Sequence, residues 1–125
     1  MARQTLQLIL VPAFILAVTA PSVIAQSKKK AAPAATYKQV QGIFNKNCVG
    51  CHQGANPPAK MNLKDYMGTM KGNDDGAVVI PGHPEKSLLV KVITKTGRGQ
   101  MPPKKSLSKA EIATIQAWIK GGAKK

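Results

Sequence analysis

Two cysteines, Cys48 and Cys51, are separated by only two residues and are followed directly by His52. They are the only cysteines in this chain of 125 residues, and they stand too close together for a disulfide to close a long, stabilising loop. A domain of this size buries a modest fraction of its surface and often needs a disulfide, a metal or a cofactor to stabilise it. The chain has only five aromatic side chains, Phe14, Tyr37, Phe44, Tyr66 and Trp118, and Phe14 lies in an N-terminal segment that we expect to be removed, which leaves four for a core. The residues around position 50 therefore decide how such a chain is held together.

The run from Cys48 to His52 has the CxxCH pattern of c-type haem attachment. Two thiols three positions apart can each add to one of the two vinyl groups on the same porphyrin edge, and the next imidazole then falls beneath the iron. A thioredoxin-like pair would need a strand-to-helix context in a mixed sheet, which the sequence does not offer. A zinc set of Cys48, Cys51, His52 and His83 is poor, because Cys51 and His52 are adjacent and point apart. We predict one haem c per chain, thioether-linked to Cys48 and Cys51.

Two segments, 36–47 and 108–122, have the pattern of helices that begin with a capping box. In each, a Thr or Ser is followed three positions later by a Gln or Glu, so that each side chain can bind the other residue's backbone N–H. Apolar residues then recur at helical spacing, and Asn47 and the Gly121–Gly122 pair are suitable ends. The apolar faces are Tyr37, Val40, Ile43 and Phe44 in the first helix, and Ile112, Ile115, Trp118 and Ile119 in the last.

Between these segments the sequence predicts two more helices. One runs over residues 84–95, with Pro84 at its first position. A shorter apolar stripe at helical spacing covers residues 63–70. The only strand-like run, residues 78–80, is too isolated to form a sheet. We therefore expect an all-α fold with about four short helices around a covalently attached haem.

The sequence resembles a class I cytochrome c and, more narrowly, is similar to the planctomycete-type cytochrome c domain. The matching stretches are residues 43–52, 80–89, 101–103 and 107–123. The resemblance implies that the first and last helices pack across each other, with Phe44 and Trp118 in contact, and that haem lies in a central crevice. In such domains an Asp usually stands where this chain has His83.

The second axial ligand of the iron has one favoured candidate and one rival. Met101 follows a glycine-containing loop and precedes Pro102 and Pro103, which stiffen the backbone that would hold its sulfur. The resemblance independently implies that Met101 is the distal ligand, with His52 as the proximal one. The rival is His83, which as a second imidazole would lower the reduction potential, although a capping or surface role is the plainer interpretation.

Other residues near the haem are assigned less directly. Met67 and Met70 share the face of the short predicted helix, so they are expected to pack against the porphyrin, while Met61 is left unassigned. A ligating imidazole usually donates its second N–H to an oxygen. Related cytochromes use a proline carbonyl after the motif, so Pro57 or Pro58 is expected to accept from His52.

The N-terminus has the layout of a secretory signal peptide. Residues 1–25 contain a positive start at Arg3, an apolar stretch over 6–18 and a small-residue end at Ala25. The apolar stretch is shorter than the roughly 20 residues that span a bilayer, so cleavage is favoured over a retained membrane anchor. Residues 26–36 read as a Lys/Ala/Pro-rich flexible linker and residues 37–123 as the cytochrome c domain. We expect a periplasmic protein.

The function predicted from these features is that of an exported, monohaem one-electron carrier with His/Met-ligated iron. The chain carries no Ser/His/Asp set, carboxylate pair or phosphate loop that would indicate bond-making chemistry, so we expect neither an enzyme nor a small-molecule substrate. A monomer is expected. Two alternatives stay open. One is a haem-based sensor or ligand-binding protein with an open or labile sixth position, and the other is the cytochrome subunit of a periplasmic dehydrogenase.

The chain is strongly basic, with 19 Lys and Arg against 5 Asp and Glu and a formal net charge of +14. The basic residues are scattered, with no aromatic platform between them, which argues against nucleic-acid binding. Positive charge instead suggests an acidic redox protein partner or an anionic membrane surface. The alternative is a generally solvated basic surface. The basic residues expected around the haem crevice are Lys60, Lys64, Arg98, Lys104 and Lys105.

Overall fold

The structure is a computed structural model that describes residues 34–95 and 99–125. The chain divides into two units, 1–30 and 31–125, and all described residues belong to the second. The predicted signal peptide, most of the predicted linker and Arg98 lie outside the described residues. Within the described part of the chain, no helix is long and apolar enough to cross a membrane.

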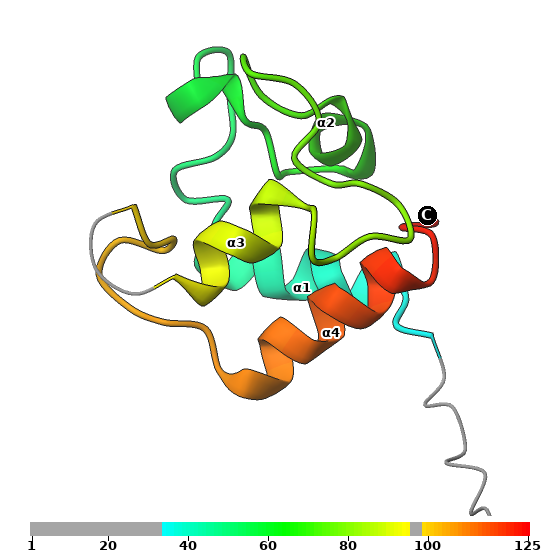
Figure 1. Ribbon diagram of the computed structural model, residues 1–125. Coiled ribbons are helices and arrows are strands. Elements are labelled where there is room, and N and C mark those ends of the chain that lie inside the picture. Colours follow the sequence, from blue (N-terminus) through cyan, green and yellow to red (C-terminus); the bar gives the residue numbers. More distant parts are fainter. Residues whose placement is uncertain (1–33, 96–98) are drawn as a thin grey trace, which may run out of the picture. The chain divides into compact units, whose positions relative to one another are not determined.

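The described unit is all-helical, as predicted. Its elements in chain order are α1 (Tyr37–Asn47), the 3₁₀ turn η1 (Pro58–Lys60), α2 (Tyr66–Lys71), α3 (Leu88–Thr94) and α4 (Lys109–Lys120) (Figure 1). Among residues 34–95 and 99–125 there is no strand, and the single isolated bridge joins Asn73 and Gly76.

Both predicted capping boxes are present, and they begin α1 and α4 at the predicted residues. At α1, the Gln39 N–H donates to Thr36 Oγ1 (3.4 Å) and the Thr36 N–H donates to Gln39 Oε1 (2.8 Å). At α4, the Glu111 N–H donates to Ser108 Oγ (3.2 Å) and the Ser108 N–H donates to Glu111 Oε2 (2.9 Å). Each box satisfies backbone donors that the first helical turn leaves without a partner.

The prediction for α3 is wrong at its start, because the helix begins at Leu88 and not at Pro84. The Ser87 hydroxyl accepts from the Ile80 N–H (2.9 Å) and donates to the His83 carbonyl (2.9 Å). These bonds tie a tight turn over residues 83–87 onto the extended run before it. The residues expected to form the first helical turn therefore form that tight turn.

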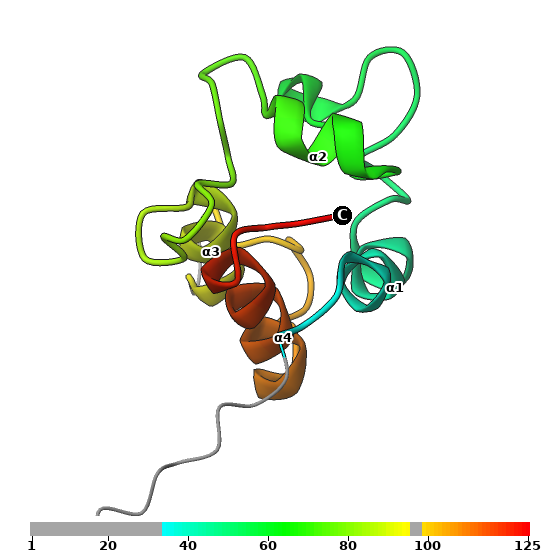
Figure 2. The ribbon, with the colours of Figure 1, turned by 90° about the vertical axis from the view of Figure 1, so that its right-hand side faces the viewer.

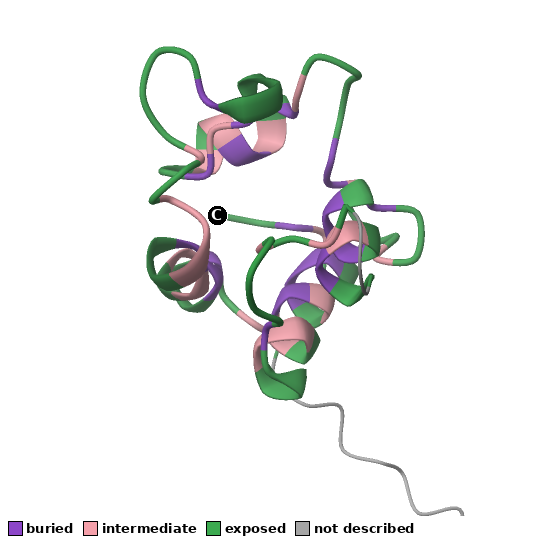
Figure 3. Cartoon of the chain, turned by 90° about the vertical axis from the view of Figure 1, so that its left-hand side faces the viewer, coloured by how far each residue is buried: buried purple, intermediate pink, exposed green. Residues whose placement is uncertain are grey.

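Three of the helices form one layer around a common core. α4 packs against α1 on one side and against α3 on the other (Figure 2). The inner faces of these helices carry the buried residues (Figure 3). Phe44 from α1 and Ile115, Trp118 and Ile119 from α4 are almost completely buried. The expected packing of the first and last helices is confirmed, and Phe44 and Trp118 belong to the same core.

The short helix α2 stands apart from this layer (Figures 1 and 2). Asp65 caps it by accepting from the Gly68 N–H at 2.7 Å. Two long-range hydrogen bonds join this region to the layer: the Tyr66 hydroxyl donates to the Ala123 carbonyl (3.0 Å), and Gln41 Nε2 donates to the Leu63 carbonyl (3.2 Å). The helix is thus held near the C-terminus of the chain and near α1.

Candidate functional site

A cavity of about 450 Å³ lies among the attachment motif, α3 and the loops that connect the helices. Its walls come from the end of α1, η1 and the residues after it, Val78, α3, and the segment 101–103. Most of these side chains are apolar. Its size lies within the range of sites that hold small molecules and cofactors, about 300–1,000 Å³.

The attachment motif continues the last turn of α1 and lies on the cavity wall. The N–H groups of Cys51 and His52 both donate to the Cys48 carbonyl, at 3.1 and 2.9 Å. This turn brings both thiols and the imidazole to the same cavity. Burial raises the pKa of the Cys48 thiol to about 11, whereas a thioredoxin-type pair depends on a lowered thiol pKa. The environment of Cys48 therefore does not favour that alternative.

The imidazole of His52 is oriented by a backbone carbonyl. His52 Nδ1 lies 3.1 Å from the Met61 carbonyl oxygen. Because a carbonyl only accepts, this contact requires the proton on Nδ1 and leaves Nε2 as the lone-pair nitrogen. The Leu63 N–H also donates to the His52 carbonyl (2.9 Å), which fixes the same segment against the motif.

The expectation that Pro57 or Pro58 would accept this proton is wrong. The Pro57 carbonyl accepts from the Lys60 N–H at 2.8 Å, and the Pro58 carbonyl accepts from the Met61 N–H at 3.1 Å. Both carbonyls are used to close η1, so the acceptor for His52 is the first carbonyl beyond that turn. Sequence gives no local signal for this choice, because it depends on how the loop folds back.

Met101 lines the same cavity as the attachment motif. Its backbone N–H donates to the Val92 carbonyl of α3 at 2.9 Å, and Val92 is itself a lining residue. Met101 is 36% exposed, so it lies at the mouth of the cavity. The four predicted site residues, Cys48, Cys51, His52 and Met101, are thus brought together in one cavity although 53 positions separate the first from the last.

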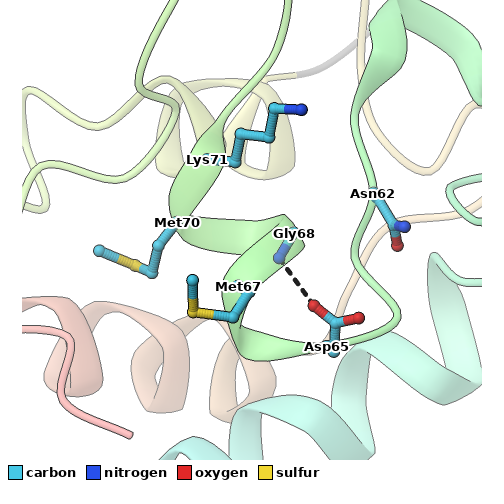
Figure 4. A pocket seen from close by; sticks show the side chains of 6 residues that line it. All are labelled: Asn62, Asp65, Met67, Gly68, Met70 and Lys71. Carbon is cyan, nitrogen blue, oxygen red and sulfur yellow. Dashed lines mark hydrogen bonds between the residues drawn. The ribbon is translucent and has the colours of Figure 1, made fainter.

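The other methionines do not all lie where they were expected relative to the cavity. Met61 is buried and lines the cavity. Met67 is 74% exposed, and with Met70 it borders a shallow hollow on α2 instead of the cavity (Figure 4). The expectation that Met67 and Met70 pack against a porphyrin is therefore wrong. The reason is that α2 begins at Tyr66, which turns the buried Thr69 inward and Met67 toward solvent.

His83 lies on the surface and not in the cavity. Its side chain is 51% exposed, and its Nδ1 lies 3.1 Å from Glu85 Oε1. The pKa of Glu85 is lowered, first by a hydrogen bond from its own backbone N–H and then by the hydrogen bond with His83. The structure does not bring His83 to the other site residues, and the N-cap of α3 is Ser87.

The basic residues expected around the crevice are all exposed where the structure describes them. Lys104 and Lys105 follow the lining residue Pro103 directly. Lys60 lies in η1 and forms an ion pair with Asp74 at 3.1 Å. Of this set, Lys60 therefore has its charge partly compensated.

Comparison with known families agrees with this arrangement. Residues 48–105 match the family model described as planctomycete cytochrome C. The matched stretch begins at Cys48 and includes Met101, so it contains all four predicted site residues. Comparisons with curated proteins and with solved structures found no match.

An all-α unit with a CxxCH motif on the wall of an apolar cavity is a c-type cytochrome domain. The family match specifies the type further: over residues 48–105 this is a planctomycete-type cytochrome c domain. In such a domain, two cysteines three positions apart indicate covalently bound haem c. The residues fit that group, because the walls are apolar, two thiols lie at the cavity and His52 has its Nε2 available.

Proposed function

We propose that this domain is a monohaem one-electron carrier whose iron is ligated by His52 and Met101. The observation that supports the proposal is the gathering of Cys48, Cys51, His52 and Met101 at one apolar cavity. Met61 also lines the cavity, but its backbone carbonyl accepts from His52 Nδ1, so it lies beside the proposed proximal imidazole, and His83 is on the surface. With both axial positions filled, a substrate would have no access to the iron.

Haem c, when bound, supplies an iron that alternates between the ferrous and ferric states. The protein holds and shields this group. The bond from His52 Nδ1–H to the Met61 carbonyl fixes the ring and makes Nε2 a stronger electron-pair donor to the iron. The bond from the Met101 N–H to the Val92 carbonyl limits the freedom of the thioether. The apolar side chains of α3 and of the segment around Leu63 exclude water, which keeps reorganisation on electron transfer small.

The ligand assignment is tested by removing one side chain at a time from the haem-loaded protein. We expect Met101→Ala to abolish the iron–sulfur charge-transfer band of the ferric protein and His83→Ala to leave it unchanged. His83→Ala is a suitable control because the His83 side chain is exposed and, among the described residues, its polar contact is with Glu85. Loss of the band in His83→Ala but not in Met101→Ala would overturn the assignment.

A second candidate function is a haem-based sensor with a labile sixth position. The observation that favours it is the 36% exposure of Met101, which leaves this residue at the mouth of the cavity. Carbon monoxide binding to the ferrous protein separates the two functions. The electron-carrier proposal expects no binding at neutral pH, and rapid binding would favour the sensor.

We further propose that the carrier is exported to the periplasm as a monomer and docks on an acidic redox partner or an anionic membrane surface. Lys104 and Lys105 beside Pro103 support this, because they place positive charge next to the cavity mouth. Electron-transfer rates with an acidic partner are expected to fall as salt rises, and more steeply for wild type than for Lys104→Glu/Lys105→Glu. Lys38→Glu on the outside of α1 is the matched control. A rate independent of salt would contradict the docking proposal.

The export proposal has its own test. If residues 1–25 are removed after export, N-terminal sequencing of the haem-loaded protein should begin at Gln26. An intact Met1 on membrane-bound protein would instead show that the segment is kept as an anchor.

A further inference from the structure

Few of the side chains that line the cavity are polar, and one of them has no role in the proposed binding of haem. Apart from the attachment motif and Met101, the polar lining residues are Asn47 and Asn73. Haem c carries two carboxylate groups, the propionates, on the edge of the ring opposite the vinyl-derived thioethers. A carboxylate that is partly enclosed needs hydrogen-bond donors. The question is which of the two amides can donate.

Both side-chain donors of Asn47 are already used in hydrogen bonds within the protein. This residue immediately precedes Cys48, so it lies at the end of the cavity where the thioethers form. Its Nδ2 donates to the Ile43 carbonyl at 3.0 Å and to Glu111 Oε1 at 3.2 Å. An amide nitrogen has two hydrogens, so both donors of Asn47 are used.

Asn73 has the opposite arrangement. Its Oδ1 accepts from the Asp75 N–H at 3.0 Å. Its backbone N–H donates to the Gly76 carbonyl (2.9 Å), and its own carbonyl accepts from the Gly76 N–H (3.1 Å). Among residues 34–95 and 99–125, Nδ2 of Asn73 donates no hydrogen bond. The carbonyl side of the amide is therefore held by the turn, while two donors remain at a residue that lines the cavity.

The turn that carries Asn73 is rigid. Gly72 has a φ of +85°, and a Cβ at this position would lie 2.1 Å from the Gly76 carbonyl oxygen. The turn is also fastened to η1, because the Asp74 N–H donates to the Ala59 carbonyl at 3.3 Å and the Asp74 carboxylate pairs with Lys60 at 3.1 Å. We call this pair of segments, residues 58–60 and 73–76, the clamp.

The clamp also holds an unusual backbone. Ala59 and Lys60 have φ values of 53° and 51°, a conformation that costs energy for residues other than glycine. Ala59, Pro58 and Asn73 all line the cavity from the clamp. The contacts between its two segments therefore keep a strained turn in place, and Asn73 is the polar side chain that the clamp contributes to the cavity.

We propose that Asn73 marks the propionate end of the cavity and that its Nδ2 donates a hydrogen bond to a haem propionate. The inference rests on the proposed binding of haem c. The nearest acidic neighbours compete little, because Asp74 is paired with Lys60 and Asp75 is exposed to solvent. Asn73 is a positioning residue for the cofactor and takes no part in ligating the iron.

The chain offers a matched pair of variants for the test. Asn73→Asp keeps an oxygen for the Asp75 N–H but replaces the donor with an acceptor. Asn62→Asp makes the same change in charge at a second turn, where Asn62 Oδ1 accepts from the Lys64 N–H at 2.9 Å. Asn62 borders the hollow on α2 and not the cavity (Figure 4). Asn73→Ala removes the donor without adding charge, and it remains informative if Asn73→Asp does not fold.

The readouts are the resonance Raman propionate bending band and the midpoint potential of the haem-loaded protein at fixed pH. We expect both Asn73 variants to shift the band and Asn62→Asp to leave it in place. Asn73→Asp should also favour the ferric form about tenfold, equal to about 59 mV for one electron, against less than about twofold for Asn62→Asp. An unshifted band in both Asn73 variants, with covalent haem and the iron–sulfur band retained, would overturn this inference alone. Absence of covalent haem from the wild type would instead overturn the proposed function.

Discussion

The helix layer and the clamp region of this domain are built by different means. In the layer of α1, α3 and α4, large apolar side chains such as Phe44 and Trp118 are almost completely buried against one another. In the clamp region, residues 58–76, a 3₁₀ turn, a six-residue helix and a glycine turn are joined by scattered hydrogen bonds and one exposed ion pair. The layer is held by the burial of large side chains, whereas the clamp region adds only the side chains of Met61, Leu63 and Thr69 to the buried residues, and we expect it to depend on the cavity beside it being filled.

The largest expected effect comes from preventing covalent attachment. In Cys48→Ser/Cys51→Ser we expect no haem to remain after denaturation, because no thioether can form. Hydrogen exchange should then show residues 58–76 losing most of their protection, while amides around Phe44 and Ile115 keep part of theirs. Mass-spectrometric exchange of both proteins provides the measurement. Equal protection of residues 58–76 with and without haem would contradict the proposed difference between the two regions.

The second prediction concerns the core of the layer. Phe44→Ala removes a ring that is 0% exposed, so the free energy of unfolding should fall by about 3–5 kcal/mol. Met67→Ala is the comparison on α2, where 74% exposure predicts a change within about 0.5 kcal/mol. Urea unfolding of the haem-loaded proteins measures both. Similar losses in the two variants would mean that α2 contributes a core of its own.

The third prediction compares two glycines. Gly72→Ala places a Cβ 2.1 Å from the Gly76 carbonyl oxygen at a φ of +85°, so it should destabilise the protein by at least about 1–3 kcal/mol and disturb the clamp. Gly42→Ala, in the middle of α1, meets nothing within 4 Å and should stabilise it by about 0.5–1 kcal/mol. Thermal unfolding of both variants tests the pair. A stabilising Gly72→Ala would show that the turn relaxes easily.

The smallest expected effect is the pH dependence of the α4 capping box. Hydrogen bonds from the Ser108 backbone N–H, then from the Ser108 hydroxyl, lower the pKa of Glu111 below its usual 4.5. A carboxyl with a lowered folded-state pKa adds stability above its unfolded pKa and loses that contribution as pH falls through the folded value. The stability advantage of wild type over Glu111→Gln should therefore be present at neutral pH and fade below about pH 4.5. A difference that stays constant down to pH 2 would exclude this cause.

Features that depend on neighbouring residues in the chain could be predicted from the sequence. Each capping box involves two residues three positions apart, so the starts of α1 and α4 were correctly expected at Tyr37 and Lys109. The CxxCH motif is equally local, and the geometry of one helical turn brings its three side chains to one wall. Met101 was found by its glycine and proline neighbours, and the structure places it at the same cavity.

Features that depend on contacts between residues far apart in the sequence could not be predicted. The start of α3 moved to Leu88 because the Ser87 hydroxyl binds the distant Ile80 N–H, and a serine has the same sequence pattern whether or not it finds such a partner. The outward turn of Met67 follows from the exact first residue of α2, since a shift of one position rotates a side chain by about 100°.

The sequence by itself determined the class of fold, the haem-attachment motif and the two helices that pair across the core, because each is encoded by residues within one or two helical turns. The tertiary structure decided which carbonyl orients His52, which methionines reach the cavity and which lining amide, Asn73, keeps side-chain donors without a partner. These outcomes depend on how η1 packs against the turn after α2. Long-range hydrogen bonds and packing determine that arrangement, and no local pattern of residues specifies them.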